Sequence, residues 1–193
     1  MLNNLKKYKV ILASGSPRRR ELLSGLGIDY TIKVLPDVNE AYPEILKGED
    51  IPLYIAREKA EAYLKEIESD ELIITADTIV WLDNEVLGKP TDEQQAKVML
   101  RMLSGKTHHV ITGVCLTTSE FQKSFTTTTE VTFAKLSEEE IDYYVEKYRP
   151  LDKAGAYGIQ EWIGFVGVEA INGSYFNVMG LPIQRLYKEL AKL

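Results

Sequence analysis

Two long segments near the middle of the chain constrain the fold most. Residues 109–118 and 125–136 both alternate apolar and polar side chains, which predicts two strands that pair as a hairpin. Before them, predicted strands and helices alternate, as in the strand at 10–14 and the helix at 53–67. An antiparallel hairpin within such an alternating pattern predicts an α/β fold with a mixed, twisted sheet flanked by helices.

Local signals mark where several helices begin and end. Ser16 followed by Pro17 predicts an N-cap and a first helical residue, and Gly27 predicts a left-handed cap at the end of that helix. Ser137, followed by a run of glutamates, is typical of a capping box. The pattern further predicts strands at 30–35, 72–82, 86–87, 165–171 and 175–178, and helices starting at Thr91 and covering 181–193.

Length and composition bound the function classes. The 193 residues suit one domain, 1–193, or one domain with two lobes. The net charge of −6 disfavours polymeric nucleic acid as a partner, because proteins that bind duplexes are expected to be basic. The single cysteine, Cys115, fits a reducing compartment, and residues 1–9 lack the apolar core of a signal peptide. We therefore expect a cytoplasmic protein that makes no membrane contact.

The segment 14–20 leads a predicted strand directly into a tight turn and a helix start. Backbone N–H groups at a helix start point outward and favour anions. Arg18, Arg19 and Arg20 oppose the helix dipole at a cost of about 0.3–1 kcal/mol each, which a bound anion would offset. The segment therefore predicts a phosphate site, although it is not a P-loop, and the alternative is a solvated basic patch.

An aspartate interrupts the apolar strand predicted at 72–82. A carboxylate is costly to bury unpaired, so Asp77 needs a metal, a cation or exposure to compensate it. The alternative is an aspartate that bonds to the backbone at a bulge or strand end. Thr78 places a hydroxyl beside it.

Two glycine-containing segments complete the candidate chemistry. Small residues in 152–160 allow a ligand to approach the backbone closely, while Lys153 could reach a phosphate and Gln160 could read the edge of a base. Lys89 lies in the turn 88–90. The alternatives are a structural glycine-rich loop and a solvated lysine.

Other conspicuous residues receive structural interpretations. His108 and His109 are adjacent, so on a strand they point to opposite faces and form a poor metal pair. Cys115 belongs to an apolar strand and is assigned to the core. The tyrosines of 142–148 are assigned to packing.

Taken together and in order, these segments resemble the Maf family of nucleoside triphosphate pyrophosphatases over about 10–190. The matching segments are 13–19, 56–60, 76–78, 88–90, 112–114, 153–160, 172–175 and 180–182. The resemblance implies a two-lobed α/β fold with a central cleft, like that of the inosine triphosphate pyrophosphatases. It also implies hydrolysis between the α and β phosphates.

The resemblance further implies roles for individual residues. The catalytic aspartate corresponds to Asp77, and an early acidic residue that binds metal corresponds to Glu40, with Asp37 in the same loop as the alternative. The three positions that track substrate choice correspond to Arg18, Thr78 and Gln160, a combination that resembles the dTTP/UTP branch rather than the branch for methylated GTP. The local pattern and the resemblance together indicate phosphate contacts from Ser14, Ser16, Arg18, Arg19, Lys59, Lys89 and Lys153.

The expected mechanism uses a divalent cation, Mg²⁺, Mn²⁺ or Co²⁺, held by Glu40 and Asp77. Asp77 would take a proton from the water that attacks the α-phosphorus, and pyrophosphate would leave. A homodimer, a role in cleaning the nucleotide pool and a link to septum formation are implied by the family only. The alternatives are a pyrophosphatase for methylated GTP, a phosphatase that releases single phosphates, and a nucleotide-binding regulator of cell division without important catalysis.

Overall fold

The computed structural model describes residues 2–36 and 38–193, and these residues form two compact units. Unit 1 comprises Met1–Asp77, Thr112–Thr127 and Gly180–Leu193, and unit 2 comprises Thr78–Ile111 and Thr128–Met179. The boundary between Asp77 and Thr78 falls inside one strand, so two adjacent candidate site residues belong to different units. The prediction of one domain with two lobes and a cleft stays a prediction.

A seven-stranded mixed sheet runs through the chain, as predicted. Its order is β2-β1-β3-β5-β6-β7, with β4 paired to β3. The strands are β1 (Lys9–Leu12), β2 (Thr31–Ile32), β3 (Glu71–Leu82), β4 (Glu85–Leu87), β5 (Thr107–Thr117), β6 (Gln122–Phe133) and β7 (Val168–Asn172). The pairs β1–β2 and β1–β3 are parallel, whereas β3–β4 and β6–β7 are antiparallel.

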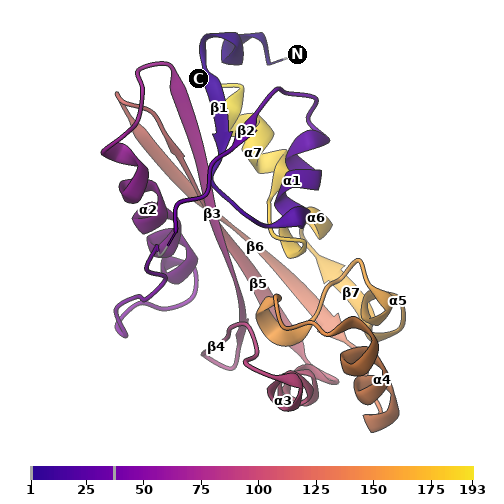
Figure 1. Cartoon of the computed structure of the whole chain (residues 1–193). Coiled ribbons are helices and arrows are strands. Elements are labelled where there is room, and N and C mark those ends of the chain that lie inside the picture. The colour runs from indigo at the N-terminus through magenta and orange to yellow at the C-terminus, as the bar shows by residue number, and fades with distance from the viewer. Residues whose placement is uncertain (1, 37) are drawn as a thin grey trace. The chain divides into compact units, whose positions relative to one another are not determined.

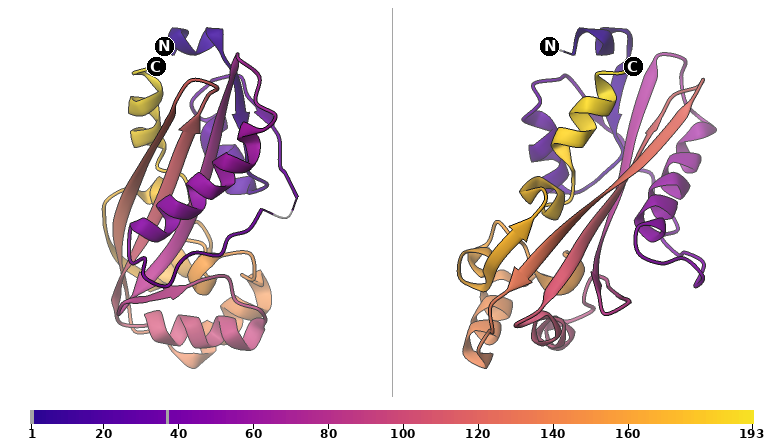
Figure 2. Two further views of the ribbon diagram at one scale, coloured as in Figure 1. Left: turned by 90° about the vertical axis from the view of Figure 1, so that its left-hand side faces the viewer. Right: turned by 180° about the vertical axis from the view of Figure 1, so that it is seen from behind.

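In unit 1, helices cover both faces of the sheet (Figures 1 and 2). Helix α2 (Asp50–Leu64) lies on one face, and α1 (Pro17–Ser24) and α7 (Ile183–Leu190) lie on the other. A short 3₁₀ helix, η1 (Asn3–Lys7), is joined to the end of α7, because the Asn4 side chain donates a hydrogen bond to the Leu190 carbonyl at 2.8 Å.

The close approach of α2 to β5 depends on a glycine. A Cβ atom at Gly113 would lie only 2.3 Å from the Pro52 carbonyl oxygen, so any side chain there would push the helix away. On the adjacent strand, the Thr75 hydroxyl donates a 2.7 Å hydrogen bond to the Ala56 carbonyl and fixes α2 to β3. The segment 112–114, part of the resemblance, therefore has a packing role in this structure.

Helix α1 begins as the sequence predicts and ends earlier. Ser16 is the N-cap and its side chain accepts a hydrogen bond from the Arg19 backbone N–H, with Pro17 as the first helical residue. The helix ends with Gly25 as C-cap, and the left-handed residue, Gly27 at φ 65°, follows two positions later.

In unit 2, α3 (Glu93–Leu103) and α4 (Glu138–Tyr148) are neighbours joined by ion pairs. Arg101 lies 2.7 Å from Glu138, and Lys97 lies 2.7 Å from Asp142. The predicted capping box at Ser137 is present at the start of α4. The short elements η2 (Ala154–Ala156), α5 (Trp162–Gly167) and α6 (Tyr175–Val178) complete this unit.

Of two strand predictions near the C-terminus, one is correct for 168–171 only and the other is wrong. Residues 165–171 are divided between the end of α5 and β7, and 175–178 form the helical turn α6. Ser174 caps this turn by accepting a hydrogen bond from the Asn177 backbone N–H, and the Asn177 amide donates to the Val110 carbonyl at 3.0 Å. A short apolar run has no periodicity that separates a strand from a helical turn, so the cap decides the outcome.

Within the described ranges, the structure contains no helix that is both long and apolar enough to cross a membrane.

Candidate active site

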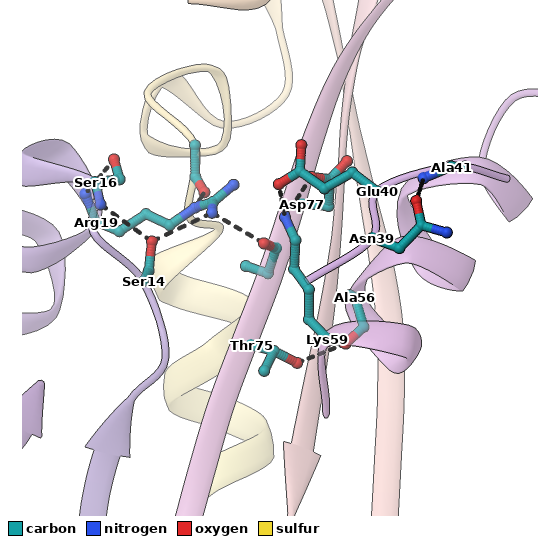
Figure 3. Close-up of polar contacts among 12 residues, drawn as sticks. Ser14, Ser16, Arg19, Asn39, Glu40, Ala41, Ala56, Lys59, Thr75 and Asp77 are labelled. Carbon is teal, nitrogen blue, oxygen red and sulfur yellow. Dashed lines mark hydrogen bonds and ion pairs between the residues drawn. The ribbon is translucent and has the colours of Figure 1, made fainter. Parts of the chain in front are cut away.

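The centre of the candidate site in unit 1 is a lysine between two carboxylates. Lys59 projects from α2, and its Nζ lies 2.8 Å from Glu40 Oε1 and 2.9 Å from Asp77 Oδ1 (Figure 3). The side chains of Lys59 and Asp77 are each 14% exposed, whereas Glu40 is 52% exposed. The prediction that Asp77 needs a compensating partner is therefore met by a cation from a neighbouring helix.

The packing of α2 explains why Lys59 reaches this position. Ala56 and Ala60 are fully buried and pack with Cys115, so the helix lies close to the sheet. Because α2 is also bonded to β3 through Thr75, the lysine one turn along the helix points toward the aspartate of the same strand (Figure 3).

The same carboxylates fit a divalent cation. Glu40 and Asp77 both contact the single positive charge of Lys59, so the fold already places a cation between them. No group of three His, Cys, Asp or Glu side chains that could hold a metal is found among the described residues. Mg²⁺ usually needs only one or two carboxylates when phosphate and water oxygens supply the other ligands. Asp37, the alternative acidic residue, lies outside the described residues.

The turn before α1 is held together by Arg19. Its Nε donates to the Gly180 carbonyl at 2.8 Å, and its Nη1 donates to the Ala76 carbonyl at 2.9 Å and to Ser14 Oγ at 3.4 Å (Figure 3). The Ser14 hydroxyl oxygen also accepts from the Ser16 backbone N–H at 3.2 Å. Arg19 thus ties α1 to β3 and to the segment before α7, and its predicted phosphate contact stays a prediction.

The electrostatics of this turn are set by burial and by neighbouring charges. Removal from water lowers the pKa of the Arg19 guanidinium, while the Asp77 carboxylate opposes that effect and the adjacent Arg18 adds to it. Arg18 is half-buried in the same first turn. The Arg20 side chain is turned back toward the loop, where it donates to the Gly15 carbonyl at 2.9 Å.

Unit 2 brings the two glycine-containing segments together. The Gly155 backbone N–H donates to the Gly88 carbonyl at 3.0 Å, which joins the turn that carries Lys89 to the loop that carries Lys153. Gly155 has φ 66°, and a Cβ there would lie 2.9 Å from a methyl group of Val80. Lys89 is exposed, and Lys153 is buried.

The loop 152–160 presents a cation and an amide. The Lys153 side chain is 10% exposed, and its Nζ lies 2.7 Å from Asp152 Oδ1 and 3.1 Å from Glu161 Oε1. Gln160 Oε1 is a buried acceptor with no hydrogen-bond partner in the described part of the chain. Thr78, also in unit 2, is half-buried on β3.

Two residues around this loop were not predicted to belong to the site. Tyr144 donates a short hydrogen bond to Glu161 Oε2, and its hydroxyl oxygen accepts from the Gly158 backbone N–H at 3.0 Å. The sequence does place Glu161 directly after Gln160, which is a signal for it. No local pattern indicates Tyr144, because it is brought there from α4 by tertiary packing.

A buried histidine and tyrosine support the same loop. His108 Nε2 lies 2.7 Å from the Tyr157 hydroxyl, and both rings pack edge-on against Phe133. Burial lowers the pKa of His108 to about 4, so this histidine is neutral at pH 7. His108 is fully buried while the His109 side chain is 42% exposed, so the two side chains point to opposite faces of β5, as predicted.

Comparison with known proteins identifies relatives over the whole chain. The family model described as Maf-like protein matches residues 9–193. A "dTTP/UTP pyrophosphatase" of Phocaeicola vulgatus is 69% identical over 193 residues, which is 100% of both chains. A protein of the same name from Bacteroides fragilis is 66% identical, again over 100% of both chains. Another, from Flavobacterium johnsoniae, is 49% identical over 98% of this chain and 97% of that protein.

Two solved structures show weaker similarity. A dITP/XTP pyrophosphatase of Mycobacterium abscessus is 19% identical, covers 66% of this chain and 74% of that chain, and has a TM-score of 0.41. A HAM1 protein of Coxiella burnetii is 16% identical, covers 96% of this chain and 100% of that chain, and has a TM-score of 0.48. Both scores are below 0.5, so neither similarity carries weight for the function.

Proposed function

Because this chain belongs to the Maf family, we propose that it is a nucleoside triphosphate pyrophosphatase that converts dTTP and UTP to the monophosphate and pyrophosphate. Relatives that match its full length are named for this activity. The observation in the structure that best supports the proposal is the Glu40–Lys59–Asp77 arrangement, in which two carboxylates and one lysine converge.

In this proposal Asp77 is the general base. Its carboxylate is held on a rigid strand by Lys59 and is mostly removed from solvent, which keeps it oriented for accepting a proton from the attacking water. Glu40 and Asp77 would hold a divalent cation. When bound, such a cation would lower the pKa of a water molecule and neutralise phosphate charge.

Lys59 has two roles in the proposal. It holds the two carboxylates in the absence of nucleotide, and it provides a positive charge for the phosphates when nucleotide binds. Arg18, Lys89 and Lys153 would contribute further positive charge, because cations favour the charge that develops as pyrophosphate leaves. Ser14 and Ser16 would add hydroxyl and backbone donors at the start of α1.

Base selection is assigned to Thr78 and Gln160, with Arg18. The buried, unbonded Oε1 of Gln160 supports this assignment, because a buried acceptor gains most from a ligand that brings a donor. Uracil and thymine carry an N3–H donor between two carbonyl groups, whereas cytosine has an acceptor at N3. A site that offers an amide acceptor would therefore favour uracil and thymine over cytosine.

The proposal also covers the cellular location, the partners and the assembly of the enzyme. We infer that it acts in the cytoplasm on free nucleotides, in cleaning the nucleotide pool, without binding polymeric nucleic acid or membranes. A homodimer is the expected assembly.

Product analysis by ion-exchange chromatography tests the proposal. The purified protein is incubated with UTP, dTTP, CTP, GTP or methylated GTP, with and without Mg²⁺ or Mn²⁺. We expect metal-dependent UMP and dTMP together with pyrophosphate. Release of single phosphates, preference for methylated GTP, or no turnover would each contradict the proposal, and the last result would favour a binding regulator.

The role of Asp77 is tested by substitution. Asp77→Asn should keep the fold and bind UTP, but its turnover should fall by about 10³-fold or more because the neutral amide cannot accept the proton. Asp83→Asn is the matched control, since Asp83 is an exposed aspartate in the turn that follows the same strand. Full activity of Asp77→Asn would remove Asp77 from the catalytic role.

A further inference from the structure

A chain of four groups connects α4 to the loop 152–160 in unit 2. The Gly158 backbone N–H donates to the Tyr144 hydroxyl, and the Tyr144 hydroxyl donates to Glu161 Oε2. The other carboxylate oxygen, Glu161 Oε1, lies 3.1 Å from Lys153 Nζ. One carboxylate therefore receives a buried hydroxyl on one oxygen and the lysine ammonium group on the other.

The three side chains around Gly158 converge on one point. A Cβ atom at Gly158 would lie 2.9 Å from the Glu161 carboxyl carbon, 3.0 Å from Gln160 Nε2 and 3.0 Å from Lys153 Cε. The absence of a side chain at Gly158 therefore makes room for all three groups. The carboxyl group of Glu161, the amide of Gln160 and the side chain of Lys153 therefore border the same small space at Gly158.

The anchor of this arrangement is rigid and stays protonated. Tyr144 is fully buried and stacks on Tyr148, so its ring has little freedom. Burial is the main cause that raises the pKa of the Tyr144 hydroxyl, and the hydrogen bond to Glu161 is the second. The hydroxyl therefore stays protonated and remains a donor at neutral pH. The Glu161 side chain is 19% exposed, so its carboxylate is held mainly by these protein contacts.

We propose that Glu161 is a positioning residue, supported by Tyr144, that fixes both the Lys153 ammonium group and the Gln160 amide for the same nucleotide. This inference rests on the function proposed above. Lys153 has many rotamers in isolation, and the observed one places its ammonium group between Asp152, at 2.7 Å, and Glu161, at 3.1 Å. Of these two carboxylates, only that of Glu161 is itself oriented by the Tyr144 hydroxyl. Without the Glu161 carboxylate, Lys153 keeps only Asp152, and the neighbouring Gln160 amide becomes less well ordered.

Glu161→Gln is the main test, because it keeps the shape and removes the charge. We expect the KM for UTP to rise about tenfold, kcat to change less than threefold, and the preference for UTP over CTP to fall several-fold. Glu161→Asp, which keeps the charge on a shorter side chain, should recover part of both losses. Tyr144→Phe should act in the same direction, because it removes the hydroxyl that orients Glu161.

Two controls on α4 separate positioning from a general loss of stability. Asp142→Asn removes an ion pair with Lys97, and Tyr143→Phe removes a hydroxyl that accepts from Lys147. Asp142 pairs with α3, and Tyr143→Phe keeps the ring that packs edge-on against Trp162, so both variants should keep the wild-type KM and base preference. If the controls shift these values as much as Glu161→Gln does, the positioning role is refuted.

A double-mutant cycle tests whether Glu161 acts through Lys153. In a Lys153→Met background, Glu161→Gln should raise the KM for UTP by clearly less than about tenfold, because the ammonium group that it positions is absent and only the Gln160 amide remains. Equal, multiplying effects in the two backgrounds would show that Glu161 acts independently of Lys153, which contradicts the inference.

Gly158→Ala provides a second perturbation. The three atoms nearest to the added methyl group all belong to side chains and none to the backbone, so we expect the protein to fold and the three side chains to move apart. The KM and the UTP preference should change together, as in Glu161→Gln. If a crystal structure of Gly158→Ala shows the side chains displaced while the KM and the UTP preference stay at wild-type values, their positions do not determine selectivity and the inference is refuted.

A crystal structure of ligand-free Glu161→Gln tests the positioning role separately from the proposed function, because it does not depend on enzymatic activity. If the wild-type protein releases no pyrophosphate from UTP, the proposed function fails, and the positions of Lys153 and Gln160 in the variant still decide the positioning. Displacement of both groups supports it. Unchanged positions refute it, whatever the activity.

Discussion

Glu189 on α7 offers the sharpest test of the electrostatics in unit 1. Its side chain is 2% exposed, and its carboxylate lies 2.6 Å from Lys123, 2.8 Å from Arg185 and 3.1 Å from Lys192. Lys123 comes from β6, so this carboxylate also connects the last helix to the sheet. Lys123 first, and then Lys192, outweigh the effect of burial and lower the pKa of Glu189 from 4.5 to about 2.

The magnitude follows from linkage between protonation and folding. The fall of the Glu189 pKa from 4.5 to about 2 corresponds to about 3.4 kcal/mol. Water screens the three cations, whose side chains are 40% to 60% exposed, so the net value is about 2 kcal/mol. Because the folded pKa is lowered, this stabilisation is present above pH 4.5 and is lost as the pH falls through about 2. At pH 3.5 it should be about two fifths smaller than at pH 7.

The assay is thermal unfolding of Glu189→Gln and wild type at pH 7 and pH 3.5. The variant should lose about 2 kcal/mol at pH 7, a fall of about 4–8 °C in Tm, and clearly less at pH 3.5. Glu61→Gln is the control, since Glu61 is an exposed acid in the same unit that accepts from Gln122 at 3.3 Å. An equal loss at both pH values would refute the electrostatic reasoning, and no loss at pH 7 would refute the contribution itself.

Three further predictions concern packing and buried groups. Gly113→Ala should destabilise the protein by more than about 2 kcal/mol in thermal unfolding, because the new methyl group would overlap the Pro52 carbonyl, and a wild-type Tm would contradict the close packing of α2. The pKa of His108 is about 4 in the folded protein and 6.5 in the unfolded chain, so the free energy of unfolding falls as the pH drops from 6.5 to 4. In urea unfolding, His108→Gln should make the free energy of unfolding less dependent on pH over that range, and an unchanged dependence would refute this. Burial raises the pKa of the Cys115 thiol and covers it, so a thiol reagent should modify native protein at least about 10²-fold more slowly than urea-unfolded protein, and rapid native labelling would contradict the burial.

Much of the secondary structure was predictable because its signals are local. The cap at Ser16 and the capping box at Ser137 both appear where the sequence places them. Each depends on hydrogen bonds or backbone conformations within a few residues, so tertiary context has little to add. The segments 165–167 and 175–178 were mispredicted because their apolar runs carry no period that separates a strand from a helix. At 175–178 the side-chain cap of Ser174 selects the helical turn.

For the candidate site, the sequence indicated the residue types but not their partners. The need for a partner at Asp77 could be inferred from the cost of a carboxylate in an apolar strand, but Lys59 is identified as that partner only by the packing of α2 on β3. Arg19 was predicted to contact phosphate, whereas in the structure it donates to the carbonyl groups of Ala76 and Gly180. A guanidinium group has five donors, and only tertiary geometry determines which acceptors they meet.

The sequence by itself determined the mixed α/β architecture, the helix starts and the family, because these depend on local patterns and on the order of motifs along the chain. The tertiary structure alone decided which charges meet. It placed Lys59 between Glu40 and Asp77, and it placed Tyr144 from α4 against Glu161 beside the loop 152–160. The physical reason is that ion pairs and buried hydrogen bonds depend on distances of a few ångströms between residues far apart in sequence, which only the packing of helices on the sheet sets.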